Sequence, residues 1–456
     1  MTVKRIGSNP KDWIDYTFDE SSVKILFHQS SSPYEEDVIA GVASINGSPV
    51  AFYAQNPKVD RGFISSLGAE KIIQIMDKAQ KEKMPILAFL FSAGVSISEG
   101  ITSGQAYAKI INRNITLSGH IPQIAVVMGS TMGAAAYSAT LMDLVIMNKS
   151  RSYLMVTSPS VVEWSIGERT TLSDLGGSEI HSRKTGIADF VEANIPDQLD
   201  RVKKIVTLLQ DQKIKEVSPL SDFPPMPEKF VAWNMEKTLQ GLVDNSEYHL
   251  YREHYGKSML CAFARIGGVS VGIIANQSNN FAGAIGVEAS LKSTRFLRIC
   301  DAYGLPLISL IDVPGFMPGT KEEQNGLLRS GANFCSAMLM RVPRISIVMR
   351  RCYGAAAFLM LQNSLNPKND LKIALPDSKI AIMGYAAARS NIYSDDPRSE
   401  EDKALDYFNN YESPHLALKS GLIDEVLEHQ KIRERVATHL QKHHKKNFEF
   451  KHPVLP

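Results

Sequence analysis

The amino-acid sequence predicts an α/β protein built from two tandem copies of one unit. The first reason is a repeated segment: Ile121–Tyr137 reads IPQIAVVMGSTMGAAAY, and Val342–Phe358 reads VPRISIVMRRCYGAAAF. A shift of 221 residues places Pro122 on Pro343, and 8 of the 16 positions counted from these prolines are identical. The second reason is that strand-like and helix-like segments alternate in the same order in both halves.

The same shift aligns residues well upstream of the repeated segment. It places identical residues on each other in the pairs Gly94 and Gly315, Pro85 and Pro306, Ala54 and Ala275, Val50 and Val271, Gly47 and Gly268, and Ile45 and Ile266. The period is far longer than that of a solenoid repeat, so the duplication indicates two globular domains in tandem.

The expected elements follow one another in the same order in each half. Two strands joined by a glycine turn predict a hairpin, apolar residues spaced by three and four predict a helix, and two apolar strands follow, the second of which runs into Gly-Ala-Ala-Ala and another helix. The expected ranges are Gly41–Ile45, Val50–Ala54, Ala69–Glu82, Ile86–Phe91 and Ile124–Met128, and then Cys261–Ile266, Val271–Ala275, Ala289–Tyr303, Leu307–Ile311 and Ile345–Met349. Such alternation indicates parallel strands with right-handed crossovers.

The boundary between the two domains is expected in Ser218–Pro227, which contains four prolines. The chain is accordingly divided into an N-terminal arm (1–40), a first domain (41–220), a second domain (221–440) and a basic tail (441–456). The tail is rich in lysine and histidine and is expected to fray.

Composition excludes several classes of protein. Hydrophobic residues make up 44% of the 456 residues, which is too much for a disordered chain. A formal net charge of +2 gives no global field that would attract nucleic acid or an anionic membrane surface. No apolar run reaches the roughly 18 residues that mark a membrane-spanning helix. The four cysteines lie far apart without metal-ligand spacing, so no metal site is expected and a reducing, cytoplasmic location is favoured.

Two features in each half could carry chemistry: a glycine loop after the third strand and a glycine at the start of the next helix. Small residues let a ligand approach the backbone, and a helix N-terminus presents free N–H groups at a positive dipole end. Together they predict an oxyanion hole that stabilises an enolate made from a thioester. The alternative interpretation is that the small residues only let helix and strand pack tightly. The residues concerned are Ala93, Gly94, Val95, Gly133 and Ala134 in the first half, and Gly315, Phe316, Gly354, Ala355 and Ala356 in the second.

Between about Gly41 and Leu440 the sequence resembles the carboxyltransferase β-subunits of propionyl-, acetyl- and methylcrotonyl-CoA carboxylases. The first half carries INGSPV at Ile45–Val50, ISEG at Ile97–Gly100 and SGHIPQIAVVMG at Ser118–Gly129. The second half carries the most specific motifs, which are IANQ at Ile274–Gln277, RFLRICDA at Arg295–Ala302, DVPGFMPGTKEEQNGLLRSGA at Asp312–Ala332, IAIMG at Ile380–Gly384 and GLIDEVL at Gly421–Leu427.

The resemblance implies a pair of crotonase-type domains and a homo-oligomer, either a trimer or a dimer of trimers. It implies an active site between the N-terminal domain of one subunit and the C-terminal domain of another. The first half would hold acyl-CoA and the second carboxybiotin. No biotin-accepting Met-Lys motif is present, so biotin is expected on a separate carrier that is loaded by a biotin carboxylase.

The resemblance also implies roles for the glycine loops and helix starts. The catalytic donors would be Gly133 and Ala134 toward the acyl thioester oxygen, and Ala355 and Ala356 toward the ureido oxygen of biotin. Substrate contacts would come from Ala93, Gly94, Val95 and Phe358, and cofactor contacts from Gly315, Phe316 and Gly354. The biotin nitrogen would act as the base, so no catalytic side chain is needed. His28, His181 and His254 are accordingly expected to be structural or exposed.

Three departures from the family pattern shape the alternatives. The family's two Gly-Gly pairs read Gly133-Ala134 and Gly354-Ala355 here, and the family's Ala-Arg in the first loop reads Val95-Ser96. Phe358 stands where the family tunes acyl length. The first alternative is a decarboxylase of a malonyl-type thioester, which would pass through the same enolate. The second is a non-catalytic subunit of the same fold, and the third is a hydratase or isomerase, which would need a pair of glutamates.

Overall fold

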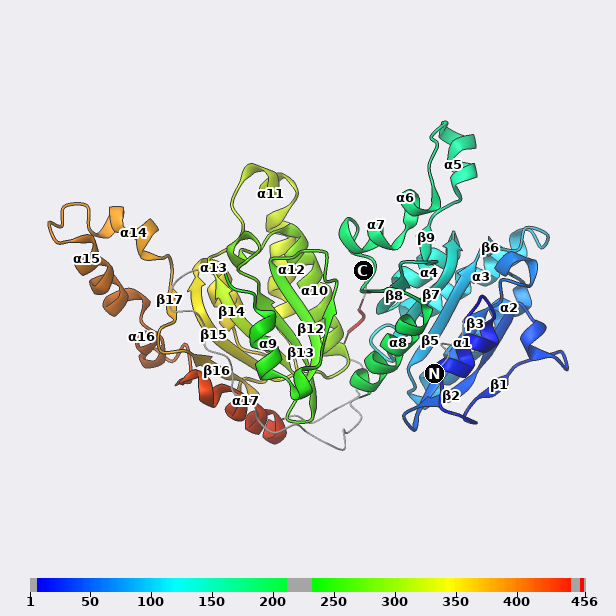
Figure 1. Cartoon of the computed structure of the whole chain (residues 1–456), viewed down its shortest axis with the longest axis horizontal. Coiled ribbons are helices and arrows are strands. Elements are labelled where there is room, and N and C mark those ends of the chain that lie inside the picture. The colour runs from blue at the N-terminus through cyan, green and yellow to red at the C-terminus, as the bar shows by residue number, and fades with distance from the viewer. Residues whose placement is uncertain (1–5, 211–231, 444–451, 455–456) are drawn as a thin grey trace. The chain divides into compact units, whose positions relative to one another are not determined.

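The computed structural model describes residues 6–210, 232–443 and 452–454 of the chain. Two compact units are found, Met1–Gln212 with Phe448–Pro456, and Lys213–Asn447 (Figure 1). The boundary expected in Ser218–Pro227 lies outside the described residues. In the part of the chain that is described, no helix is both long and apolar enough to cross a membrane.

The first unit is a sheet flanked by helices. Its strands are β1 (Lys24–Leu26), β2 (Val38–Ile45), β3 (Ser48–Gln55), β4 (Phe63–Ile64), β5 (Ile86–Ser92), β6 (Gly94–Val95), β7 (Gln123–Met132), β8 (Leu144–Asn148), β9 (Tyr153–Met155) and β10 (Phe190–Glu192). Its helices are α1 (Pro10–Thr17), α2 (Ser66–Glu82), α3 (Ile101–Leu117), α4 (Ala134–Leu141), α5 (Pro159–Ile166), α6 (Leu172–Gly176), α7 (Ser178–Arg183) and α8 (Ile195–Leu209).

The second unit repeats this plan and adds helices near its end. Its strands are β11 (Tyr248–Tyr251), β12 (Met259–Ile266), β13 (Val269–Asn276), β14 (Leu307–Val313), β15 (Arg344–Tyr353), β16 (Leu371–Ala374), β17 (Lys379–Ala381) and β18 (Glu425–Val426). Its helices are α9 (Glu236–Leu242), α10 (Val287–Ala302), α11 (Thr320–Gln324), α12 (Leu327–Met338), α13 (Gly354–Leu361), α14 (Tyr385–Ile392), α15 (Glu400–Tyr407), α16 (Pro414–Lys419) and α17 (His429–His443).

Both main sheets have the same strand order, which confirms the predicted duplication. The first runs β1-β2-β3-β5-β7-β8-β10 and the second β11-β12-β13-β14-β15-β16-β18, with β9 and β17 each paired to the long strand of its unit. The first two pairings of each sheet are antiparallel and the later ones are parallel. A separate two-stranded sheet joins β4 and β6. The central strands are buried almost throughout, as expected when helices cover a parallel sheet.

The predicted hairpins turn in the same way in the two units. Asn46 and Gly47 have φ of 50° and 80°, and Gly267 and Gly268 have 59° and 81°, which fits a two-residue turn with both central residues at positive φ. A carboxylate fixes each turn: Asp19 accepts from the N–H groups of the first pair at 3.0 and 2.8 Å. Asp244 does the same for the second pair, also at 3.0 and 2.8 Å.

The predicted first helix of each half forms, and its start is set by local chemistry. The helix expected over Ala69–Glu82 begins three residues earlier because the Ser65 side chain caps it, accepting from the Gly68 N–H. Its apolar residues Ala69, Ile72, Ile75, Met76 and Ala79 are buried, which is the spacing of a helix with one face on a core.

The ends of the chain are more tightly integrated than an arm and a tail would be. In the arm expected over residues 1–40, β1 pairs with β2, and Trp13 and Ile14 of α1 are fully buried. In the tail expected over 441–456, residues 441–443 belong to α17. Val454 is buried and its N–H donates to Ser118 Oγ at 2.7 Å. Residues 444–451 lie outside the described part.

Candidate active site

The glycine loop of the first unit follows β5 directly. Ser92 is buried, and its hydroxyl donates to the Gly62 carbonyl at 2.8 Å and accepts from the Gly94 N–H at 3.1 Å. Gly94 has a φ of +119°, which L side chains rarely adopt, so glycine allows the turn into β6. Ala93 and Val95 on either side are half-buried. The Gly94 N–H is therefore used inside the loop and is not available to a ligand.

Gly133 begins the helix that follows β7, but it is not a free donor. Its N–H donates to the carbonyl oxygens of Met155 and Val156 at 3.2 and 3.1 Å, so the expectation that it supplies one of the two donors is wrong. Gly133 has φ 60° and ψ −131°. A Cβ there would meet nothing nearer than the Val156 carbonyl oxygen at 3.9 Å, so there is room for a side chain. Glycine is required at this position by its backbone conformation.

Two N–H groups after Gly133, those of Ala134 and Ala135, are available to a ligand at this helix start. Ala136 and Tyr137 donate to the Gly133 carbonyl at 3.1 and 3.3 Å. For Ala134 and Ala135, the described residues offer no backbone acceptor outside the helix, which is the usual state of the first N–H groups of a helix. Ala134 is half-buried, so its N–H is the donor of the predicted pair that remains.

The structure brings the first loop and the first helix start together. Ser92 pairs with Thr131 across β5 and β7. A Cβ on Gly94 would lie 4.0 Å from the carbonyl oxygen of Met132, the residue that precedes Gly133. The predicted juxtaposition of loop and helix start is thus present within the first unit.

The glycine loop of the second unit has free space beside Gly315. Gly315 has a φ of +143°, and a Cβ there would have no atom within 4 Å. Its carbonyl accepts from the Ile285 N–H at 3.1 Å, and the Met317 N–H donates to the Ile285 carbonyl at 3.0 Å. These bonds fix the loop, with half-buried Phe316 between them.

The helix start of the second unit repeats the geometry of the first. Gly354 has a φ of +67°, and a Cβ there would lie 3.7 Å from the Ile382 carbonyl. Ala355, which the repeat places on Ala134, is exposed, and Ala356 is fully buried. Phe358 is 47% exposed. Ala355 is therefore the predicted residue at the accessible end of this helix.

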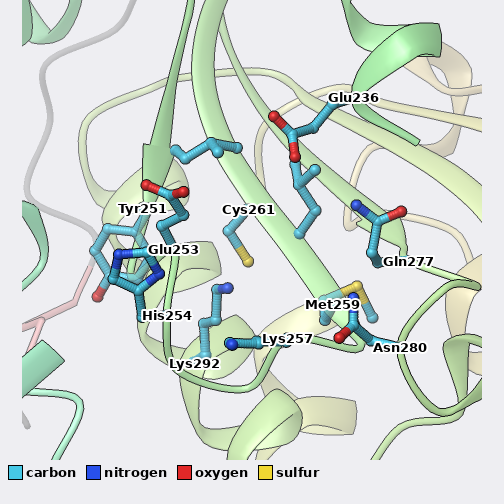
Figure 2. Close-up of a pocket in the computed structure, with 12 residues that line it drawn as sticks. Glu236, Tyr251, Glu253, His254, Lys257, Met259, Cys261, Gln277, Asn280 and Lys292 are labelled. Atoms are coloured by element: carbon cyan, nitrogen blue, oxygen red, sulfur yellow. The ribbon is translucent and has the colours of Figure 1, made fainter. Parts of the chain in front are cut away.

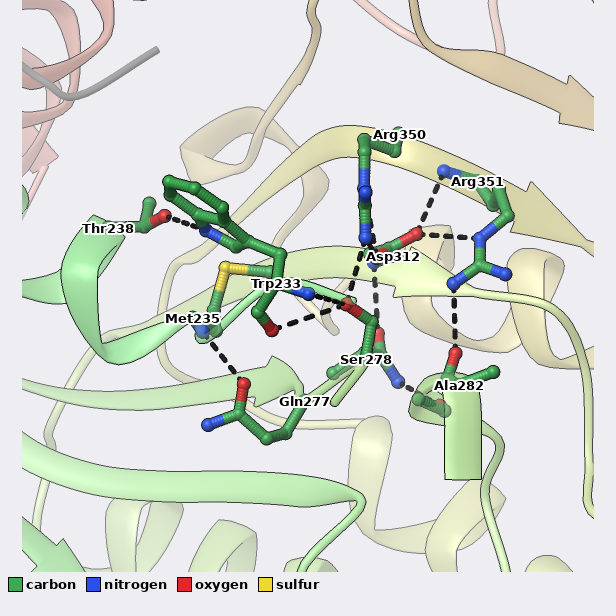
Figure 3. Close-up of polar contacts among 11 residues, drawn as sticks. Trp233, Met235, Thr238, Gln277, Ser278, Ala282, Asp312, Arg350 and Arg351 are labelled. Carbon is green, nitrogen blue, oxygen red and sulfur yellow. Dashed lines mark hydrogen bonds and ion pairs between the residues drawn. The ribbon is translucent and has the colours of Figure 1, made fainter. Parts of the chain in front are cut away.

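A buried charge cluster supports the second loop (Figure 3). Asp312, the last residue but one of β14, is fully buried and ion-paired with Arg350 at 2.5 Å and Arg351 at 2.9 Å. Arg350 also donates to Ser278 Oγ at 2.8 Å, and Arg351 donates to the Ala282 carbonyl at 2.9 Å. The cluster joins the ends of β14 and β15, from which the Gly315 loop and the Gly354 helix begin.

In the first unit, uncharged residues occupy the positions equivalent to Asp312 and Arg350. A shift of 221 residues places Asp312 on Phe91 and Arg350 on Gly129. A Cβ on Gly129 would stand 2.4 Å from the Phe91 ring, so the ring occupies the space beside the glycine. The replacement of Gly129-Ser130 by Arg350-Arg351 inside the repeat is the only sign of this exchange in the repeated segment.

His181 is structural, as expected. Its ring nitrogens lie 2.8 Å from the Leu154 carbonyl and 2.9 Å from Thr185 Oγ1. Burial lowers the pKa of His181 below its ordinary value, although the contact with the Leu154 carbonyl raises it. The ring is thus kept neutral and satisfied by its neighbours, away from the role of a general base.

Known proteins match the chain over nearly all of its length. The carboxyl transferase domain family matches residues 12–454. The propionyl-CoA carboxylase beta chain of Roseobacter denitrificans is 33% identical over 425 residues, covering 90% of this chain and 83% of that one. The methylmalonyl-CoA decarboxylase subunit alpha of Veillonella parvula is 34% identical over 415 residues, covering 88% and 81%.

A solved structure shows the same fold. The transcarboxylase 12S hexamer with methylmalonyl-coenzyme A bound has a TM-score of 0.87 and 30% identity, and the match covers 96% of this chain and 90% of that one. The prediction of two crotonase-type domains in tandem is confirmed. With a family match over almost every residue and relatives above 30% identity, the chain belongs to the carboxyl transferase domain family.

Proposed function

We propose that the chain is the carboxyltransferase subunit of a biotin-dependent acyl-CoA carboxylase. It would move a carboxyl group from carboxybiotin, held on a separate carrier chain, to the α-carbon of an acyl-CoA. Besides family membership, one structural observation supports this proposal. Each unit presents a helix start with a positive-φ glycine beside a glycine loop, so two equivalent sites can each bind a carbonyl oxygen.

In the first unit the groups that bind the acyl thioester are main-chain groups. The Ala134 N–H, at the positive end of the α4 dipole, donates to the thioester oxygen. This bond strengthens as negative charge builds on that oxygen in the enolate, which is the basis of its catalytic effect. Ala93 and Val95 border the same site, and Gly94 holds the loop in place through Ser92.

The second unit fits the ureido ring of biotin. Ala355 is exposed at the start of α13, and the open side of Gly315 leaves room for a planar ring to approach the backbone. Carboxybiotin, when bound, supplies the carboxyl group and the ureido nitrogen that takes the α-proton. The main chain of Gly354, Ala355 and Ala356 positions the ureido oxygen, and Phe316 and Phe358 border the site.

Reconstitution tests this function. The chain is mixed with a biotin carboxylase, a biotinylated carrier, ATP, bicarbonate labelled with ¹⁴C and a panel of acyl-CoA thioesters. We expect acid-stable label in the acyl product, which depends on both the carrier and ATP. Absence of label for every thioester, with the intact fold verified by circular dichroism, would contradict the proposal.

A decarboxylase is the second candidate, because methylmalonyl-CoA decarboxylase alpha subunits are 32% and 34% identical to the chain. The same donors would stabilise the same enolate, formed by loss of a carboxyl group instead of a proton. The distinguishing measurement omits ATP. Transfer of the carboxyl group from methylmalonyl-CoA to an unloaded carrier, faster than the ATP-dependent forward reaction, would favour this candidate.

We also propose that the chain assembles into a trimer or hexamer and works in the cytosol. The transcarboxylase 12S core is a hexamer. Large apolar side chains are exposed on and near α5, which projects from its own unit in Figure 1, and they include Val156, Val161, Trp164 and Ile166. Light scattering on the full chain is expected to give three or six times the monomer mass, and a monomer at micromolar concentration would contradict assembly. The cytosolic location rests on the four free cysteines.

A further inference from the structure

A cavity of about 240 Å³ opens in the second unit (Figure 2), and none of its lining residues belongs to a glycine loop. It lies between α10, the start of β12 and the segment that precedes β12. Lys292 and Cys261 are buried members of its lining. Its other polar lining residues are Glu236, Glu253, His254, Lys257, Gln277 and Asn280. The cavity is smaller than sites for drug-sized ligands, which are roughly 300–1,000 Å³, but several times the roughly 30 Å³ of one water molecule.

Lys292 is a buried cation without a carboxylate partner. It is 2% exposed, and its ammonium donates to the Tyr255 carbonyl at 3.0 Å. No carboxylate among the described residues lies within ion-pairing distance of it. An ammonium has three donors, so two remain for something in the cavity. A buried charge with one neutral acceptor is unfavourable unless further acceptors or an opposite charge join it.

No neighbouring acidic group among the described residues is ion-paired with Lys292, although the charge of Glu253 raises the lysine's pKa. Burial raises the pKa of the Cys261 thiol to about 11, so the thiol is neutral. Glu236 accepts from the Tyr248 hydroxyl at 3.0 Å, and Glu253 is exposed. Burial lowers the pKa of Lys292 to about 8, with smaller effects from Cys261, Arg252 and Glu253.

The first unit shows what the missing partner would be. The repeat places Lys292 on Lys71, which is buried and ion-paired with Glu36. The same shift places Glu36 on Lys257. The shift is valid at this point, because the Asn56 N–H donates to the Asp37 carbonyl at 2.9 Å and the equivalent Gln277 N–H donates to the Ser258 carbonyl at 2.8 Å.

Where the first unit has the carboxylate of Glu36, the second unit therefore has a second cation, Lys257. A cavity lies at this place in both units, and the Lys71–Glu36 ion pair that lines it in the first unit is replaced by two lysines in the second. Lys292 is buried and Lys257 is exposed. Both lysines line the cavity, and an ammonium group binds an oxyanion through charge-assisted hydrogen bonds.

We propose that this cavity binds a small oxyanion, a carboxylate or a phosphate, whose oxygens accept from Lys292 Nζ and pair with Lys257. The anion takes the place that Glu36 holds in the first unit. The site belongs to the second unit alone and does not depend on the carboxyl transfer proposed above. Its occupant stabilises the folded state, because it binds the native cavity and not the unfolded chain.

Thermal unfolding of the full chain tests the site with inorganic phosphate and acetate as probes, each against sodium chloride at the same ionic strength. We expect the midpoint to rise with one or both probes in a saturable way, and the better probe identifies phosphate or carboxylate as the ligand class. Lys292→Met should weaken the apparent affinity by about tenfold or more, since hydrogen bonds to charged groups contribute that much. Lys431→Glu, on exposed α17 sequence, should keep the response.

Lys257→Glu gives an independent test if Lys292→Met fails to fold. It restores the carboxylate of the first unit, so the midpoint without anion should rise and the response to anions should disappear. It makes the same change in net charge as Lys431→Glu, which controls for charge. Equal responses in the wild type, Lys257→Glu and Lys431→Glu would mean a general salt effect and would overturn the proposal, as would no response in the wild type.

Discussion

Asp312→Ala is expected to lower the free energy of unfolding by about 3–5 kcal/mol, because it removes the counter-ion of two arginines at a buried position. Asp312 is fully buried, and the Arg350 side chain is only 5% exposed. Once the carboxylate is gone, the guanidinium of Arg350 remains buried without this counter-ion. The change also loosens the ends of β14 and β15, so the loop at Gly315 should lose its fixed position.

Denaturant unfolding followed by tryptophan fluorescence measures this effect, since Trp233 contacts the cluster through Ser278 (Figure 3). Arg389→Ala is the matched control in the same unit. It breaks the exposed ion pair with Glu400, in which both side chains are 59% exposed, and should cost no more than about 1 kcal/mol. Similar losses for the two variants would show that the buried cluster is not a stabilising element.

Ala134→Pro is expected to lower kcat for carboxyl transfer by about 10²–10³-fold, the effect of losing one oxyanion-hole donor. Ala134 is the first residue of α4, where proline is well tolerated because its φ suits the helix and its missing N–H has no partner in the helix. The substitution therefore removes the proposed donor and leaves the helix in place. The rate is measured with the reconstituted carrier system, and the fold by circular dichroism.

The control for this variant is Ala134→Gly, which keeps the N–H and restores the Gly-Gly pair of related proteins, and it should retain most of the activity. Gly133→Pro would not serve as a test. Gly133 has a φ of 60°, which proline cannot adopt, and its N–H already donates to Met155 and Val156. Full activity in Ala134→Pro would remove the Ala134 N–H from the mechanism.

The predicted order of elements is correct because it rests on local patterns. Apolar runs bounded by turns mark strands such as β5, and spacing by three and four marks α2, whatever the rest of the chain does. Boundaries differ by a few residues where a cap or a long strand extends the pattern. Ser65 starts α2 early, and β15 continues past the expected Met349 to Tyr353 because it pairs with β17.

The candidate site could be predicted only in part. The sequence identifies both glycine loops and both helix starts, since the duplication makes them stand out. It does not show which N–H groups are free. The Gly133 N–H donates to Met155, the last residue of β9, and to Val156, which follows it, more than twenty residues away along the chain. The Asp312 cluster was missed for the same reason, because Arg350 lies 38 positions from Asp312 and reaches it only in the folded sheet.

The two copies of one α/β unit can be recognised without coordinates, since identical residues recur at a constant offset along the chain. The sequence also determined where backbone donors could occur, because glycine and alanine at strand–helix joins carry that information locally. The tertiary structure alone decided which donors and charges are satisfied. Hydrogen bonds and ion pairs form between distant segments, so Lys71 is paired with Glu36 while Lys292, its equivalent, donates to the Tyr255 carbonyl.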